Sequence, residues 1–148
     1  MKDGLAVLLN RRHRPKKGTP MTKPAPDYDE IVRVVQLYVD GFAGDVEKFR
    51  RAFHESAWIY YTDEQGELHK WLLVEGFERW AASHRKIKGR IISVTQAGDL
   101  AVVLLGFDEP ADPKETWVDA HTLLRLNGVW KIMAKTATHS SRAAWAAP

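Results

Sequence analysis

"VDAHTLLRLNGVWKIMAKTATH", residues 118–139, holds two apolar and β-branched runs on either side of Asn127-Gly128. Asn-Gly is the preferred dipeptide for a two-residue type I′ turn, which joins neighbouring antiparallel strands. The stretch therefore predicts a hairpin with strands over about 116–126 and 129–138. Polar side chains interrupt both strands, among them Asp119, His121, Lys131, Lys135 and His139. The direction in which each of them points decides where a site lies.

The turn also predicts which residues share a face of this hairpin. If Leu126 and Val129 close the turn, counting outward places Ala120 opposite Lys135, and successive residues alternate between two faces. One face then carries Val118, Ala120, Thr122, Leu124, Leu126, Val129, Lys131, Met133, Lys135, Ala137 and His139. The other face carries Trp117, Asp119, His121, Leu123, Arg125, Trp130, Ile132, Ala134, Thr136 and Thr138.

Upstream of the hairpin, two helices are predicted before any strand. Asp27 and Glu30 form a capping-box pattern at the start of the first helix. Gly41 and Gly44 are expected to end this helix, and Asp45 to cap a second, shorter one. Apolar residues recur at helical spacing along one buried stripe of the first helix: Ile31, Val34, Val35, Tyr38 and Phe42.

The middle of the chain predicts a hairpin, a helix and two further strands. The aromatic run 56–62 is followed by the turn signal "DEQG" and a short partner strand at about 67–70. A helix from about Leu73 and strands at about 90–96 and 99–107 follow. The helix presents one face with Leu73, Phe77, Trp80, Ala81 and His84. This order predicts an α+β fold, namely a cone-shaped α+β barrel in which a curved mixed or antiparallel sheet wraps around one long helix and two shorter ones.

Length and composition indicate one folded domain with a basic arm. The chain has 148 residues, of which 45% are hydrophobic, so a single domain over 27–148 is expected. Residues 1–26 hold seven Lys or Arg and one Asp, whereas the remainder holds fifteen Lys or Arg and eighteen Asp or Glu. The proline-rich arm is predicted to be disordered. Its segment "RRHRPKK" indicates a nucleic-acid or nuclear-targeting patch, or an extension upstream of Met21; we favour the second and expect no nucleic-acid partner.

Several classes of site and location are excluded by composition and spacing. The chain has no cysteine, which rules out disulfides and thiolate chemistry and is typical of a cytoplasmic protein. The apolar run "GLAVLL" is too short to span a membrane. The six histidines show no metal-ligand spacing, and no phosphate-binding loop or nucleophile motif is present. We therefore expect no metal, no cofactor and no membrane association.

Two segments resemble the nuclear transport factor 2-like superfamily: "VVQLYVDGFAGDVEKFRRAFHESAWI", residues 34–59, and "WVDAHTLLRLNGVWKIMAK", residues 117–135. Within this superfamily, the chain is most similar to the lumazine-binding-like and polyketide-cyclase-like group. The similarity covers about residues 28–139. The resemblance implies the cone fold. It leaves the function open, because this fold hosts isomerases, dehydratases, cyclases, transport adaptors and binding proteins.

The ketosteroid isomerases, one enzyme branch of this superfamily, allow a comparison residue by residue. The resemblance implies that Tyr38, within "VVQLYV", donates a hydrogen bond to a substrate oxygen, and that Trp80, within "WAAS", is a second aromatic residue of the site. The two carboxylate positions of those enzymes fall on Tyr61 and at or beside Thr122. Without a carboxylate there, their proton shuttle is missing, so enzyme status is left open.

The same resemblance orients the strands. It places Thr122 toward the cavity. Because side chains alternate along a strand, residues on the same face as Thr122 are then expected to point to the cavity too: Lys135, Ala137 and His139. Asp119 and His121 then lie on the outer face. The resemblance implies a homodimer through an apolar patch on that outer face: Trp117, His121, Trp130 and Ile132. In the strand 56–62, the alignment favours Ile59 and Tyr61 inward, and a one-residue slip would turn Trp58 and Tyr60 inward instead.

Two hypotheses for function follow. In the first, the cone binds a small apolar or aromatic ligand, with contacts from Tyr38, Phe42, Ile59, Tyr61, Phe77, Trp80, Thr122, Met133, Lys135 and His139. If this site is catalytic, the reaction is acid–base chemistry of the isomerase, dehydratase or cyclase type, with Tyr38, Lys135 and His139 as candidates. In the alternative, the chain is a non-catalytic protein-interaction or dimerisation module whose cone is a filled core.

Overall fold

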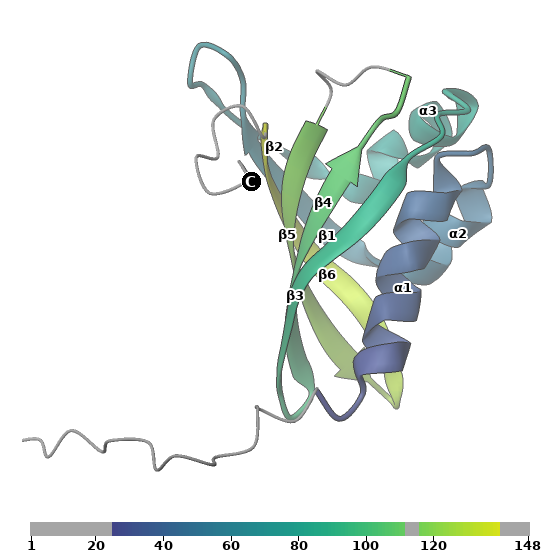
Figure 1. The fold of residues 1–148 in the computed structure, drawn as a ribbon, viewed down its shortest axis with the longest axis vertical. Coiled ribbons are helices and arrows are strands. Elements are labelled where there is room, and N and C mark those ends of the chain that lie inside the picture. The colour runs from purple at the N-terminus through teal and green to yellow at the C-terminus, as the bar shows by residue number, and fades with distance from the viewer. Residues whose placement is uncertain (1–24, 112–115, 140–148) are drawn as a thin grey trace, which may run out of the picture.

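The computed structural model describes residues 25–111 and 116–139 as three α-helices, one short 3₁₀ helix and six strands (Figure 1). The helices are α1 (Tyr28–Gly41), α2 (Val46–Ala52), η1 (Leu73–Gly76) and α3 (Phe77–Ala82). The strands are β1 (Phe53–Thr62), β2 (Leu68–Leu72), β3 (Lys88–Ala97), β4 (Leu100–Asp108), β5 (Thr116–Leu126) and β6 (Val129–His139). The expected set of one long and two shorter α-helices is confirmed. The predicted arm, except for its last two residues, lies outside the described residues.

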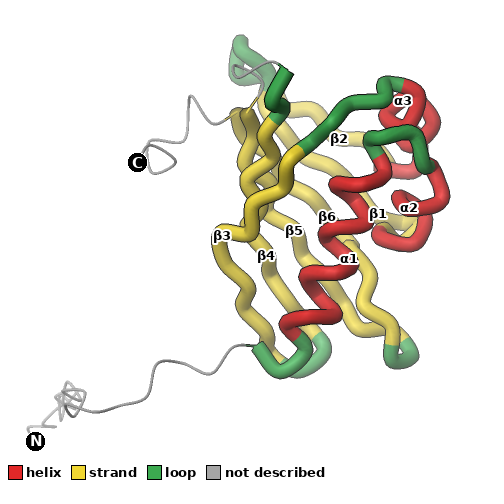
Figure 2. Tube along the Cα trace, turned by 45° about the vertical axis from the view of Figure 1, so that its right-hand side comes forward, coloured by secondary structure: helices red, strands yellow, loops and turns green. Residues whose placement is uncertain are grey.

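The six strands form one mixed sheet in the order β2-β1-β6-β5-β4-β3. β1 and β6 run parallel, and every other neighbouring pair is antiparallel. Within the described residues β2 and β3 are the two edges, so the curved sheet does not close into a complete barrel. The helices gather on one side of the sheet (Figure 2). One sheet face therefore lines the inside of a cone, and the fold predicted from the sequence is confirmed.

The start of α1 is tied to the sheet by Asp27. This residue occupies the N-cap position, but its carboxylate makes no capping hydrogen bond. It accepts instead from Gln96 Nε2 at 2.9 Å and from Arg125 Nη1 at 2.6 Å. The capping-box prediction is therefore wrong for the side chain of Asp27, which links α1 to β3 and β5.

The junction between α1 and α2 follows the predicted turn chemistry. Gly44 has a φ of 120°, which favours glycine, and the carboxylate of Asp45 caps α2 by accepting from the Glu47 N–H at 3.1 Å. Gly41 is required for a different reason, because a Cβ there would lie 2.7 Å from the ring of Phe49. The close approach places Phe49 under α1, in the aromatic core.

The predicted turn is present at the end of the β5–β6 hairpin. Asn127 and Gly128 have φ values of 50° and 80°, the positive values that a type I′ turn requires. Leu126 pairs with Val129, as the sequence predicts. The local chemistry of the turn therefore sets the register of the residues next to it.

The register of this hairpin changes at Met133, which is skipped in the pairing between β5 and β6 and forms a β-bulge. Beyond the bulge Lys135 pairs with His121, and not with Ala120 as predicted. One extra residue exchanges the faces of all the residues that follow it. Lys135 therefore lies on the same face of the sheet as Asp119 and His121.

Burial corrects the predicted orientation of this hairpin. Asp119 and His121 were expected outside, yet they are 1% and 0% exposed and lie within the cone. Trp130 and Ile132 are buried core residues as well. Thr122, expected to face the cavity, is exposed on the outer face. The prediction of a homodimer contact through Trp117, His121, Trp130 and Ile132 is therefore wrong. The side chains of these residues pack inside the chain.

Candidate functional site

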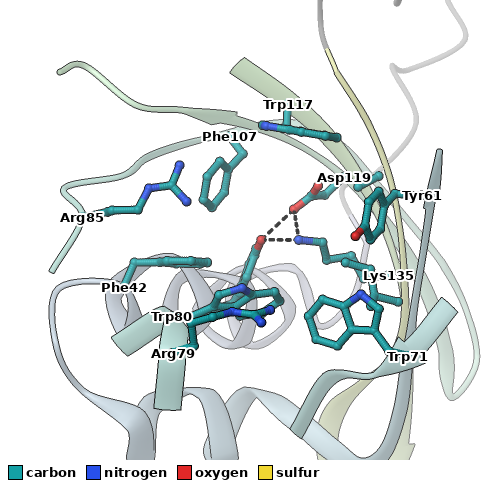
Figure 3. Close-up of a pocket in the computed structure, with 13 residues that line it drawn as sticks. Phe42, Tyr61, Trp71, Arg79, Trp80, Arg85, Phe107, Trp117, Asp119 and Lys135 are labelled. Carbon is teal, nitrogen blue, oxygen red and sulfur yellow. Dashed lines mark hydrogen bonds and ion pairs between the residues drawn. The ribbon is translucent and has the colours of Figure 1, made fainter. Parts of the chain in front are cut away.

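The cone contains a cavity of about 290 Å³. Besides Tyr38, six aromatic side chains form much of its wall (Figure 3), namely Phe42, Tyr61, Trp71, Trp80, Phe107 and Trp117. The volume is near the lower end of the range for small-molecule sites, about 300 to 1000 Å³. The cone is therefore hollow, unlike the filled core of the alternative hypothesis.

Three polar side chains meet inside this aromatic wall. Tyr38 Oη donates to Asp119 Oδ2 at 2.9 Å, and Lys135 Nζ donates to Tyr38 Oη at 2.6 Å. Lys135 Nζ also lies 3.2 Å from Asp119 Oδ2, which completes the triangle drawn in Figure 3. All three residues are at most 6% exposed. They form a buried ion pair bridged by a phenol, called here the Tyr38–Asp119–Lys135 cluster.

Three different elements position this cluster. Tyr38 lies on the buried stripe of α1, and its ring is fully buried. Asp119 lies on β5 and follows the inward alternation of Leu123 and His121 on that strand. Lys135 lies on β6, where the bulge at Met133 turns it inward. The cluster therefore depends on contacts between residues that are far apart in the sequence.

Burial shifts the pKa values of Lys135 and Tyr38 in the cluster. It lowers the pKa of Lys135, although the Asp119 carboxylate opposes this effect. Burial, with the neighbouring Asp119 carboxylate, raises the pKa of Tyr38 well above its ordinary value. Lys135 Nζ also lies 4.9 Å and 5.1 Å from the ring centroids of Tyr38 and Trp80, within cation–π range. Tyr38 therefore keeps its proton at neutral pH, and Lys135 loses its own more easily than an exposed lysine does.

His121 lies beside the cluster as a buried neutral group. Its ring meets the Tyr38 ring edge to face, with 5.2 Å between centroids. Burial lowers the pKa of His121 from 6.5 to about 4, against the opposing effect of Asp119. Neither ring nitrogen has a hydrogen-bond partner among the described residues. The approach of His121 Nε2 to Asp119 Oδ2, at 3.8 Å, is therefore not an ion pair at pH 7.

Two arginines contribute to the lining of the cavity. Arg85 donates through Nε and Nη2 to Glu109 Oε2, at 3.0 Å and 2.6 Å. Arg79 is exposed, and its guanidinium lies 5.7 Å from the ring centroid of Trp71. The charge of Arg85 is therefore compensated by Glu109, whereas Arg79 places a cation at the solvent side of the cavity.

The cavity brings together these residues predicted to contact a ligand: Tyr38, Phe42, Ile59, Tyr61, Trp80 and Lys135. Ile59 and Tyr61 face inward, as the alignment favours, so Trp58 and Tyr60 lie on the other face of β1. Contact of these residues with a ligand stays a prediction.

Four other predicted contact residues are not part of the lining. Phe77 is buried behind the wall and stacks on Phe49, with 5.4 Å between ring centroids. Met133 is half-buried at the bulge, and Thr122 lies on the outer face. His139 is half-buried and meets Trp117 edge to face at 5.2 Å. His139 therefore supports the wall through Trp117 and does not reach the Tyr38–Asp119–Lys135 cluster.

Sequence reasoning missed part of the lining: Trp71, Arg79, Arg85, Phe107 and Asp119. Phe107 ends an apolar run and Trp71 lies just beyond the predicted short strand, so both gave only a general signal for a buried strand. Asp119 is the important omission. Asp119 was expected on the outer face, and this expectation is wrong, because Asp119 lies inside the cone beside Tyr38.

The described residues contain neither a metal-binding cluster nor a membrane-spanning helix. No three His, Cys, Asp or Glu side chains within residues 25–111 and 116–139 lie where they could hold one metal ion. None of the helices in the same ranges is long and apolar enough to cross a membrane.

A family model described as "Putative lumazine-binding" matches residues 26–137, which include all three elements of the cluster. The chain belongs to this family. The match runs from the start of α1 almost to the end of β6. Among curated proteins, none matches the chain.

Solved structures of nuclear transport factor 2-like proteins of unknown function are similar to this chain. The protein from Shewanella baltica OS155 is 22% identical, with 76% of this chain and 92% of that chain covered and a TM-score of 0.68. The protein from Silicibacter pomeroyi DSS-3 is 24% identical, with 74% and 92% covered and a TM-score of 0.63. The one from Methylobacillus flagellatus KT is 22% identical, with 78% and 94% covered and a TM-score of 0.66. The predicted superfamily is confirmed, and the likeness concerns the fold alone.

Proposed function

We propose that this chain binds a small, flat, largely aromatic molecule in the cavity of its cone. The observation that carries the proposal is an aromatic cavity that contains the buried Tyr38–Asp119–Lys135 cluster. Aromatic walls stack on flat ligands, and a few convergent polar groups fix the orientation of such ligands. The family description names lumazine, a flat bicyclic heterocycle, and so supports the same class of ligand.

The polar cluster favours a particular edge on this ligand. Lys135 has three N–H donors, and Tyr38 and Asp119 engage two of them. Asp119 Oδ1 is a buried acceptor with no hydrogen-bond partner in the described parts of the chain. A carbonyl oxygen next to an N–H or O–H group satisfies both Lys135 and Asp119. The ligand class is therefore a planar heterocycle or phenol that presents such an edge.

We also propose that the cluster supports acid–base chemistry of the isomerase, dehydratase or cyclase type. The favouring observation is the continuous path from Lys135 Nζ through Tyr38 Oη to Asp119 Oδ2. Lys135 donates its remaining N–H to an oxygen on which negative charge develops, Tyr38 holds Lys135 and Asp119 together, and the carboxylate accepts a proton. His139, the third candidate from the sequence, is left out because it does not line the cavity.

Replacement of Tyr38 by phenylalanine is expected to weaken ligand binding about tenfold, because the lost hydroxyl orients Lys135 and Asp119 toward the ligand and one hydrogen bond is worth about 1 to 1.5 kcal/mol. The measurement is isothermal titration calorimetry of the full chain with lumazine and a panel of flat heterocycles and phenols. Compounds that bind should also raise the melting temperature of the wild-type chain.

Tyr60→Phe is the matched control for this experiment, because Tyr60 lies beside Lys70 on the sheet face that points away from the cavity. It should leave the dissociation constant unchanged. The binding proposal fails if no compound in the panel binds the wild-type chain. The site assignment fails if Tyr38→Phe and Tyr60→Phe have the same effect.

We propose, in addition, that two copies of the chain associate through the outer sheet face. Apolar side chains are exposed there on β4 and β5, where Leu100 pairs with Leu124 and Val102 lies nearby. Leu124→Glu is expected to convert a two-chain species to a single chain, measured by light scattering after size-exclusion chromatography, because it buries a charge in an apolar contact. Val74→Glu, an exposed apolar residue of η1, is the control. A wild-type chain that is a monomer at every concentration would overturn this proposal.

A further inference from the structure

We propose that Lys135 forms a reversible covalent imine with aldehydes or ketones that enter the cone, so that the chain captures carbonyl compounds. This inference rests on the ligand-binding function proposed above, and it names the substrate class of that site. It stands on the position of one amine: Lys135 Nζ lines the cavity, is enclosed by aromatic rings and touches a phenol and a carboxylate.

The surroundings of Lys135 meet the first requirement for imine formation, which is a neutral amine. An ammonium group has no lone pair, so it must give up a proton before it attacks a carbonyl carbon. Asp119 Oδ2 lies 3.2 Å from Nζ, and Tyr38 Oη connects the two through contacts of 2.6 Å and 2.9 Å. The proton passes to Asp119 directly or through the Tyr38 hydroxyl. Burial lowers the pKa of Lys135, which makes the loss of this proton easier than from an exposed lysine.

The same groups meet the second requirement, which is proton transfer to and from the carbonyl oxygen. The Lys135 lone pair forms the C–N bond, and the π electrons of the C=O bond move to oxygen, which takes the proton held by Asp119. Asp119 then accepts a proton from the new C–N nitrogen and returns it to the hydroxyl, which leaves as water. The products are a protonated imine and one water molecule. The atoms and charges balance without an oxidant or reductant.

The charge balance of the site explains why this product is stable there. The reaction replaces a lysine ammonium by an iminium cation, and the Asp119 carboxylate is ionised before and after it. The buried ion pair therefore persists, with Tyr38 still able to donate to Asp119. The rings of Trp80 and Phe107, whose centroids lie 5.1 Å and 5.9 Å from Nζ, shield the imine from the water that would hydrolyse it.

Lys131 provides a matched comparison on the same strand. Its Nζ donates to the carbonyl oxygens of Arg50 and Arg51 at 3.1 Å and 2.7 Å, outside the cavity. Those contacts orient the amine toward two acceptors that cannot remove its proton. A lysine on β6 that is partly buried but lacks a carboxylate should form an imine much more slowly at neutral pH.

The experiment treats the full chain with benzaldehyde and cyanoborohydride at pH 7, followed by peptide mass spectrometry. The expected result is a benzyl adduct on Lys135, formed at least about tenfold faster than on Lys131, because Lys135 touches a carboxylate that can take its proton and Lys131 touches only carbonyl oxygens. Benzyl alcohol, which occupies the cavity without a carbonyl group, should protect Lys135 in the wild-type chain. Lys135→Arg should remove the fast adduct, and Lys131→Arg should retain it.

Two results separate failure of this inference from failure of the proposed function. If benzyl alcohol binds by calorimetry but the adducts form only on other lysines, the imine inference is wrong and ligand binding stands. If neither compound binds and Lys135 is unmodified, both are overturned. Protection by benzyl alcohol is measured on the wild-type chain, so the test remains decisive even if Lys135→Arg does not fold.

Discussion

Asp119→Asn is expected to lower the free energy of unfolding at pH 7 by about 3 to 5 kcal/mol, because it leaves the buried ammonium of Lys135 without its counter-charge. Asparagine keeps the shape of the side chain and an acceptor for Tyr38, so the substitution isolates the charge. The measurement is equilibrium unfolding in urea, compared with the wild-type chain.

The free energy of unfolding that Asp119→Asn loses has an upper limit, set by the cost of holding Lys135 neutral. Lys135 can release its proton, and holding a lysine neutral at pH 7 costs about 1.4 kcal/mol for each unit below its normal pKa of about 10.4, or just under 5 kcal/mol. A lysine whose pKa is lowered in the folded state gains stability as pH rises toward its unfolded pKa. The difference between Asp119→Asn and the wild-type chain should therefore shrink between pH 7 and pH 9.

Asp99→Asn is the control for a carboxylate in an exposed ion pair. Asp99 pairs with Arg125 at 2.7 Å and is 68% exposed, so its removal should change stability by less than about 1 kcal/mol. Replacing the whole cluster at once, by Tyr38→Phe, Asp119→Leu and Lys135→Met, should restore most of the stability, since apolar residues of similar size remove the buried charges. Equal losses for Asp119→Asn and Asp99→Asn would contradict the assignment of a buried ion pair.

Lowering the pH from 6.5 to 4 is expected to destabilise the chain by about 3 kcal/mol through His121 alone. Burial lowers the pKa of His121 to about 4 in the folded state, whereas its ordinary value, which applies to the unfolded chain, is 6.5. Between these values the unfolded state binds the proton and the folded state does not, so stability is present above pH 6.5 and falls as the pH drops. The measurement is the free energy of unfolding at intervals from pH 7 to pH 4.

His121→Phe isolates this contribution. The ring nitrogens of His121 lack hydrogen-bond partners among the described residues, and the ring packs against Tyr38 and Phe53, so a phenyl ring fits the same aromatic surroundings. The variant should be as stable as the wild-type chain at pH 7 and should lose less stability down to pH 4. His54→Gln, on the half-buried His54, should keep the wild-type slope. Identical slopes for all three chains would refute the buried neutral histidine.

Much of the fold is predictable from the sequence because its signals are local. The helical spacing around Tyr38, the cap at Asp45 and the turn at Asn127-Gly128 each depend on residues within a few positions of one another. These signals give the order of elements and, with the resemblance, the cone fold. The cavity wall was predicted in part, since periodicity finds the aromatic faces of helices and strands and the resemblance indicates which of them point inward.

The polar part of the site was harder to predict, because burial of charge contradicts the binary pattern. Asp119 and His121 alternate with apolar residues on β5, and charged side chains in strands normally face water. The resemblance places Thr122 inward, and uninterrupted alternation then predicts that Lys135 points inward as well. The orientation was wrong and the bulge at Met133 was missed, and for Lys135 the two errors cancel.

The elements and the turn at Asn127-Gly128 are predictable from the sequence alone, because each rests on contacts that are short-range along the chain, and the family resemblance makes Tyr38 a candidate. The meeting of Asp119 and Lys135 inside the cone depends on the tertiary structure. A bulge of one residue exchanges the faces of a strand, and a buried charge is tolerated only beside a partner from another element. That partner is supplied by the packing of α1 against the sheet, where the Tyr38 hydroxyl joins β5 to β6.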